Sequence, residues 1–128
     1  MNRRNFLVAT AAAPLAASLA PVRSHAAAPT SSMVSAARAC LIMADICMEH
    51  CRVQGAAAAD CARAVAQVRA VLQGVPVLAS ADDPVYLGML APLAARVCAQ
   101  AAVVARSHAD QAPCMDFALA CEAVSAAS

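Results

Sequence analysis

Three cysteines recur at helical spacing in the stretch ACLIMADICMEHCR, and this spacing constrains the chain more than any other feature. Cys40, Cys47 and Cys51 stand seven and four residues apart, which returns their side chains to one face of an α-helix. A core-facing stripe ordinarily carries Leu, Ile or Val at such positions. A stripe of thiols therefore predicts a helix whose buried face has a chemical function in addition to packing.

The composition favours helices and excludes one large class of partners. Among 128 residues there are two Phe, one Tyr, no Trp and three Gly. Abundant Ala with so few aromatic residues indicates an all-α domain of closely packed helices. The chain has no Lys, and nine Arg against eight acidic residues give a formal net charge of +1. Because no basic patch is available for phosphate, nucleic acid is not expected as a partner.

The N-terminal residues 1–26 are predicted to be a cleavable signal peptide of the twin-arginine export route. The sequence NRRNFL holds paired arginines followed by Phe and Leu, and a weakly apolar run comes next. Ser-His-Ala at 24–26 supplies a small, any, small cleavage pattern. A retained membrane anchor is the alternative, but it would need about 20 strongly apolar residues. We expect residues 27–128 to be a periplasmic domain without a stable membrane anchor after cleavage.

Caps and breakers divide this domain into four expected helices. The first is predicted from an N-cap at Ser31 or Ser32 to about Gln54, just before Gly55. The second runs from near 60 to 72, where the Gly and Pro at 74 and 76 stop or kink it. The third runs over 84–107, and the fourth begins at 113. Four helices with short connections most simply form an antiparallel four-helix bundle.

Cysteines occur on all four expected helices, on stripes compatible with the bundle axis. At a rise of ~1.5 Å per residue they fall in one half of the bundle, as a partial column of sulfur. The other half is expected to be aliphatic, around Met33, Leu72, Leu78, Met89 and Leu90. The candidate metal ligands are the inward-facing cysteines and one histidine near the bundle mouth, namely Cys40, Cys47, Cys51, Cys61, Cys98, Cys114, Cys121 and His50.

Two interpretations of these thiols need no metal. Disulfides are natural in an exported protein, and inter-helix pairs such as Cys61 with Cys114 stay open. Cys40 and Cys47, however, lie about 10 Å apart along one helix, beyond the ~7 Å reach of a bridge. Seven is an odd number, so at least one thiol stays unpaired within the chain. Packing of Cys as a small apolar residue explains one or two positions better than seven.

Metal binding explains the pattern more completely. Thiolates are soft donors that select Cu(I), zinc or iron–sulfur clusters. Zinc and iron–sulfur sites usually have two-residue Cys spacings in loops, and this chain has none. The i, i+4 pair Cys47 and Cys51 instead suits the low coordination number of Cu(I). A four-ligand zinc site at the Cys51, Cys61 and Cys114 end, completed by His50 or His108, is the weaker alternative.

From about residue 35 to residue 122 the chain resembles the twin-arginine-exported copper storage proteins. The matching residues are Cys40, Cys47, His50-Cys51, Asp60-Cys61-Ala62-Arg63, Val97-Cys98-Ala99, Cys114 and Cys121. The resemblance implies a four-helix bundle whose inward cysteines bind many Cu(I) ions. Members of that family carry further cysteines where this chain has Val65, Val68, Leu72, Ala102, Ala105, Phe117 and Val124. It therefore implies a cysteine-depleted member that holds fewer ions, concentrated in one half of the bundle.

These observations together predict an exported protein that stores or sequesters Cu(I) on core thiolates, with copper ions as its partner. The alternative is a disulfide-stabilised periplasmic scaffold or interaction protein without a metal role. An enzyme is not expected: Cys47 and His50 form an i, i+3 pair, but neither a third orienting group nor an oxyanion site accompanies them. Many outward Ala positions leave a homo-oligomer open.

Overall fold

The computed structural model describes residues 31–128, and every regular element in this range is a helix. The first helix spans 31–54. It is followed by the 3-10 helix η1 (Gly55–Ala58), then α2 (Ala59–Leu72), α3 (Gly74–Ser80), α4 (Pro84–Arg106) and α5 (Ala112–Ala127). The all-α prediction is confirmed for this part of the chain. The predicted signal peptide, residues 1–26, lies outside the described residues.

Gly55 ends the first helix, as predicted. Its φ of +69° lies in the left-handed region, which Gly adopts without the steric penalty of a Cβ. The short η1 turn that follows brings α2 back against the 31–54 helix. Arg69 of α2 forms an ion pair with Asp45 of that helix, with 3.2 Å between Nε and Oδ1.

The segment around Gly74 and Pro76 divides the expected second helix into α2 and α3. Gln73 alone separates the two helices, and Pro76 lies in the first turn of α3, where its missing N–H costs little. A Cβ built on Gly74 would lie 3.1 Å from Cδ2 of Leu90. Gly74 therefore lets α3 pack closely against α4.

α4 begins where the sequence predicts it. Asp83 is its N-cap, and the Asp83 carboxylate accepts a hydrogen bond from the backbone N–H of Tyr86 at 3.2 Å. Pro84 occupies the first helical position, where its fixed φ favours the helix. Pro92 lies inside the helix and neither begins nor ends it.

Replacing Asp83 with Ala is expected to lower the free energy of unfolding by about 1 kcal/mol, because the Tyr86 N–H loses its acceptor. Asp83→Asn keeps an acceptor oxygen and should retain most of the stability. Chemical denaturation of the reduced protein, followed by circular dichroism, measures both variants. Equal losses in Asp83→Asn and Asp83→Ala would show that the cap is not the cause.

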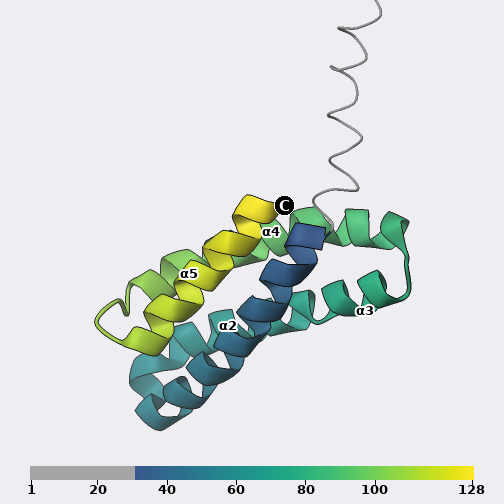
Figure 1. The fold of residues 1–128 in the computed structure, drawn as a ribbon. Coiled ribbons are helices and arrows are strands. Elements are labelled where there is room, and N and C mark those ends of the chain that lie inside the picture. Colours follow the sequence, from purple (N-terminus) through teal and green to yellow (C-terminus); the bar gives the residue numbers. More distant parts are fainter. Residues whose placement is uncertain (1–30) are drawn as a thin grey trace, which may run out of the picture.

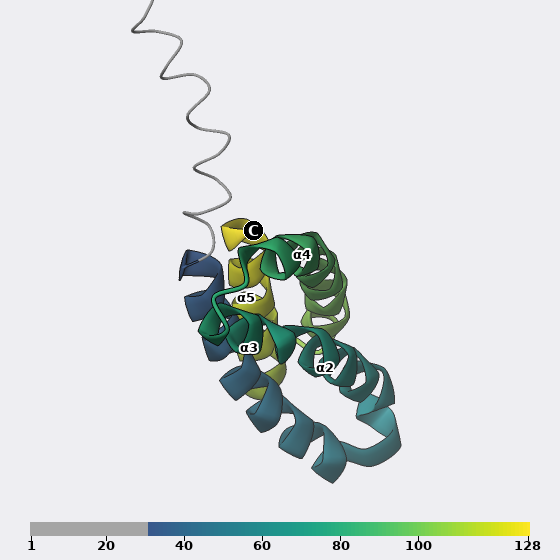
Figure 2. The ribbon, with the colours of Figure 1, turned by 90° about the vertical axis from the view of Figure 1, so that its right-hand side faces the viewer.

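Helices distant in sequence lie side by side. α4 contacts both α2 and α5, and α3 contacts α2 and α4. The 31–54 helix runs beside α5 in the two views of Figures 1 and 2. The C-terminus lies near the start of the 31–54 helix (Figure 1). The η1 turn and the α4–α5 connection lie together at the opposite end.

Small side chains and thiols fill the core. Phe117 is the largest fully buried side chain, and all seven cysteines are buried together with Val65, Val68 and many Ala residues. Within residues 31–128 the core has no buried polar or charged residue. Because Ala and Cys are small, the helices can approach closely, and the sulfur atoms make up much of what lies between them.

Met89 does not belong to the aliphatic half of the core, contrary to the prediction. Its side chain is 67% exposed, because Leu87 and Leu90 occupy the inward face of that turn of α4. Val85, Met89 and Leu93, four residues apart, form an exposed apolar stripe instead. Association of the chain into a homo-oligomer stays a prediction.

Two helical stretches, Ser31–Ser80 and Pro84–Arg106, are long and apolar enough to cross a membrane by length and composition. Core helices satisfy the same criterion. Both stretches carry fully buried cysteines, and 28% of the most apolar window of each is buried.

Candidate metal centre

Four buried cysteines from three helices meet beside the η1 turn. Cys47 and Cys51 come from the 31–54 helix, Cys61 from the first turn of α2 and Cys114 from the first turn of α5. Their Sγ atoms all lie within 4.8 Å of one another. We call this group the four-thiol cluster.

The closest sulfur contacts of the four-thiol cluster form a nearly equilateral triangle. Sγ of Cys47 lies 3.8 Å from that of Cys61 and 4.0 Å from that of Cys114, and the latter two are 3.9 Å apart. Each edge of this triangle joins two different helices. The triangle therefore depends on how the helices pack and not on spacing within any one of them.

Three further cysteines form a second group farther along the helices. Cys40 of the 31–54 helix, Cys98 of α4 and Cys121 of α5 have Sγ atoms within 4.8 Å of one another. Cys40 and Cys121 are the closest pair, at 3.7 Å. All three side chains are fully buried. We call this group the three-thiol cluster.

The structure divides the predicted column of sulfur into these two groups. Along α5, Phe117 follows Cys114 by three residues and precedes Cys121 by four, so all three share one helical face. Phe117 is fully buried and occupies the stripe between the two cysteines. On the 31–54 helix, Cys40 and Cys47 are about 10 Å apart and belong to different clusters.

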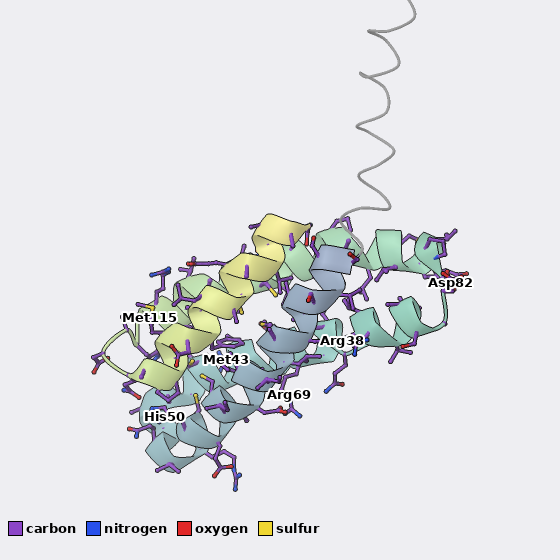
Figure 3. All side chains as sticks on the ribbon, in the orientation of Figure 1. Arg38, Met43, His50, Arg69, Asp82 and Met115 are labelled. Carbon is purple, nitrogen blue, oxygen red and sulfur yellow. The ribbon has the colours of Figure 1, made fainter. Side chains whose placement is uncertain are left out.

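His50, the eighth predicted ligand, belongs to neither cluster. It lies near the end of the 31–54 helix (Figure 3), where its Nε2 hydrogen-bonds Oε1 of Gln111. His108 is likewise engaged: its Nε2 lies 2.9 Å from Oδ1 of Asp60, and this partner lowers the pKa of the Asp60 carboxyl. Each of the seven predicted cysteines thus belongs to one of the two clusters, whereas the histidine belongs to neither.

Thiols of the four-thiol cluster do not ionise independently. Contact with Cys47 lowers the pKa of Cys61 to about 6, whereas burial raises the pKa of Cys114 to about 12 and also raises that of Cys51. Contact with Cys61 raises the pKa of Cys47. Neighbouring S–H groups stabilise the first thiolate, but a second negative charge beside it in the core is costly.

The three-thiol cluster behaves in the same way. Contact with Cys121 lowers the pKa of Cys40, and contact with Cys40 raises the pKa of Cys121. In both clusters, further thiolates need a cation to neutralise them. Each cluster could therefore take on further negative charge together with a metal ion.

Both clusters can hold a metal ion. All seven cysteines are free thiols, and Sγ separations of 3.7–4.0 Å are too long for the ~2.0 Å bond of a disulfide. Two sulfurs bound to one metal at ~2.3 Å lie about 3.8 Å apart when the geometry is tetrahedral. The observed separations are compatible with that spacing, as they are with ordinary contact between neighbouring thiols.

No protein-family model matches this chain, and comparisons with curated proteins and with solved structures gave no significant match. The candidate site therefore rests on its own residues. Seven buried thiols, contributed by helices far apart in sequence, form two groups whose spacing is compatible with binding a metal ion.

Proposed function

We propose that residues 27–128 form an exported four-helix bundle that binds Cu(I) on its core thiolates and stores or sequesters it. The proposed ligands are Cys40, Cys47, Cys51, Cys61, Cys98, Cys114 and Cys121. The proposal also makes this chain a cysteine-depleted relative of the twin-arginine-exported copper storage proteins.

The observation that carries the proposal is the gathering of buried thiols into two groups with metal-binding spacing. The donors in both groups are all sulfur, and soft sulfur donors select Cu(I) over harder ions. Cu(I) also carries one positive charge, so a pair of thiolates and the ion leave a single negative charge in the core. This small residual charge per ion favours several Cu(I) ions in the core over a single site with many thiolates and a large negative charge.

The helix arrangement supports the bundle part of the proposal. The 31–54 helix lies beside α5, α5 contacts α4, and α4 contacts α2, which returns to the first helix through η1. α3 then extends α2 after the break at Gln73. Export by the twin-arginine route, a periplasmic location and cleavage after residue 26 are proposed from the sequence of residues 1–26.

The decisive experiment counts free thiols in the purified, unreduced domain and then titrates the reduced domain with Cu(I) against a competing chelator. The proposal expects seven free thiols and more than one tightly bound Cu(I) ion per chain. Six thiols lost to disulfides would favour the disulfide-stabilised scaffold instead. Binding no stronger than the chelator control, with all thiols free, would exclude copper storage.

Cu(I) affinity is expected to fall as the pH falls. Thiols with raised pKa values, such as those of Cys51 and Cys114, are protonated at neutral pH, so each must lose a proton when it binds the ion. Cys61, with a pKa of about 6, is already ionised above that pH and releases none. A Cu(I) ion held by Cys61 and one neighbour should therefore lose about tenfold in affinity per pH unit in the neutral range.

Chelator competition at several pH values measures this dependence. The slope should steepen below the pKa of Cys61, because both ligands then carry protons. An affinity independent of pH would mean that the ion is not held by these thiols.

A further inference from the structure

The two clusters differ in the number of sulfur atoms that they offer one ion. The four-thiol cluster places four Sγ atoms within 4.8 Å of one another, whereas the three-thiol cluster has three, and no His, Asp or Glu among residues 31–128 joins either group as a further ligand. A closed tetrahedral site for a divalent ion needs four protein ligands. Only the four-thiol cluster can supply them.

The sulfur positions of the four-thiol cluster agree with such a tetrahedron. Four thiolates at ~2.3 Å from a central ion have edges of about 3.8 Å. The triangle formed by Cys47, Cys61 and Cys114 has edges of 3.8, 3.9 and 4.0 Å, and it forms one face of that tetrahedron. Cys51 is the fourth candidate ligand, since it stands one helical turn beyond Cys47 and its Sγ lies within 4.8 Å of the other three.

The two clusters also differ in the charge of their surroundings. A divalent ion with four thiolates carries a net charge of −2, which a buried site must compensate. Cys61 and Cys114 each occupy the third position of their helices, α2 and α5, and neither helix has an N-cap side chain that caps it. The partial positive charge of both helix N-termini therefore lies within one turn of two of these cysteines.

The charged side chains beside the N-terminus of α2, Asp60 and His108, are paired with each other. Asp60 accepts the N–H of Cys61 at 2.8 Å and pairs with His108, and the Cys114 N–H donates to the carbonyl oxygen of Gln111 at 3.1 Å. Cys40, Cys98 and Cys121, by contrast, lie in the interiors of their helices. No helix terminus compensates a charge-rich complex there, which favours a monovalent ion on few thiolates.

We propose that the four-thiol cluster binds one tetrahedral divalent ion of the Zn²⁺ class, and that the three-thiol cluster does not. Cys61 binds as the thiolate, the other three cysteines release their Sγ–H protons to solvent, and four sulfur–metal bonds form with no change in oxidation state. The ion joins the 31–54 helix, α2 and α5 at one end of the molecule. This inference deepens the proposed function, because it assigns different metal preferences to the same thiols.

Co²⁺ is a suitable probe, because its visible spectrum reports tetrahedral geometry and thiolate ligation directly. Reduced domain is titrated anaerobically with Co²⁺, and bound Co²⁺ is then displaced with Zn²⁺. The wild type is expected to bind one Co²⁺ per chain with sulfur-to-metal charge-transfer bands. Cys51→Ala should weaken Co²⁺ binding by at least about 100-fold, whereas the matched variant Cys98→Ala in the three-thiol cluster should bind Co²⁺ like the wild type.

Circular dichroism verifies that each variant keeps its helices, and Cys114→Ala provides the same test from another helix should Cys51→Ala not fold. No Co²⁺ binding by the wild type, unchanged binding by Cys51→Ala, or equal loss in Cys98→Ala would each overturn the inference. A separate Cu(I) titration distinguishes the two proposals. If the domain binds Cu(I) but not Co²⁺, the divalent-ion proposal is wrong and copper storage stands. If it binds Co²⁺ but not Cu(I), copper storage is wrong and the divalent-ion proposal stands.

Discussion

Cys61→Ala is expected to abolish tight Cu(I) binding at the four-thiol cluster and to leave the three-thiol cluster able to bind. Cys61 contacts both Cys47 and Cys114 and is the thiol of that cluster that ionises first, with a pKa of about 6. Removing it takes away two edges of the sulfur triangle at once. The loss of a direct ligand should exceed the ~10–100-fold loss that follows removal of an outer hydrogen-bond partner.

Cys121→Ala is the reciprocal variant, because it removes the closest partner of Cys40 at 3.7 Å and spares the four-thiol cluster. Val65→Ala is the matched control for packing: Val65 is fully buried on α2, one turn beyond Cys61, but has no sulfur. Chelator competition should give fewer Cu(I) ions for each Cys variant and an unchanged number for Val65→Ala. If ion number instead follows the stability of the three variants, the thiols do not act as ligands.

Phe117→Ala is expected to lower the free energy of unfolding of the metal-free protein by about 3–5 kcal/mol. Phe117 is the largest fully buried side chain, and its neighbours on the inward face of α5 are cysteines too small to fill the space. A loss of this size is a large share of the 5–15 kcal/mol typical of a folded domain. Urea denaturation of the reduced protein, followed by circular dichroism, measures it.

Leu119→Ala is the control for this variant, because Leu119 lies on the same helix but is 52% exposed. Its effect should stay within about 0.5 kcal/mol, as for most surface substitutions. Similar losses in the two variants would contradict the assignment of Phe117 to the core between the clusters.

Much of the local structure follows from the sequence, because caps and breakers act over a few residues. Gly55 ends the first helix and Asp83 with Pro84 begins α4, as their conformational preferences require. The exposure of Met89 was not predicted, because apolar residues stand on more than one face of α4 and the sequence does not indicate which face is buried. In the structure Leu90 lies beside Gly74 of α3 and Leu87 is buried, whereas Met89 is exposed.

The buried thiols could be predicted from helical spacing, but their division into two clusters could not. Sequence spacing determines which face of a helix a residue occupies. The axial position of one helix relative to the next depends instead on the connecting turns. Phe117 was the available signal, since a large side chain between Cys114 and Cys121 interrupts a sulfur stripe. His50 was assigned as a ligand by its position near a helix end, and its partner Gln111 lies in a turn that helical spacing does not place.

X-ray absorption at the copper edge, on the reduced domain loaded with Cu(I), tests the central claim most directly. Buried clusters with sulfur as the shared donor type predict a first coordination shell of sulfur alone, in wild type and in a His50→Ala variant alike. A shell containing nitrogen or oxygen, or a shell that changes when His50 is removed, would contradict copper binding by the core thiolates.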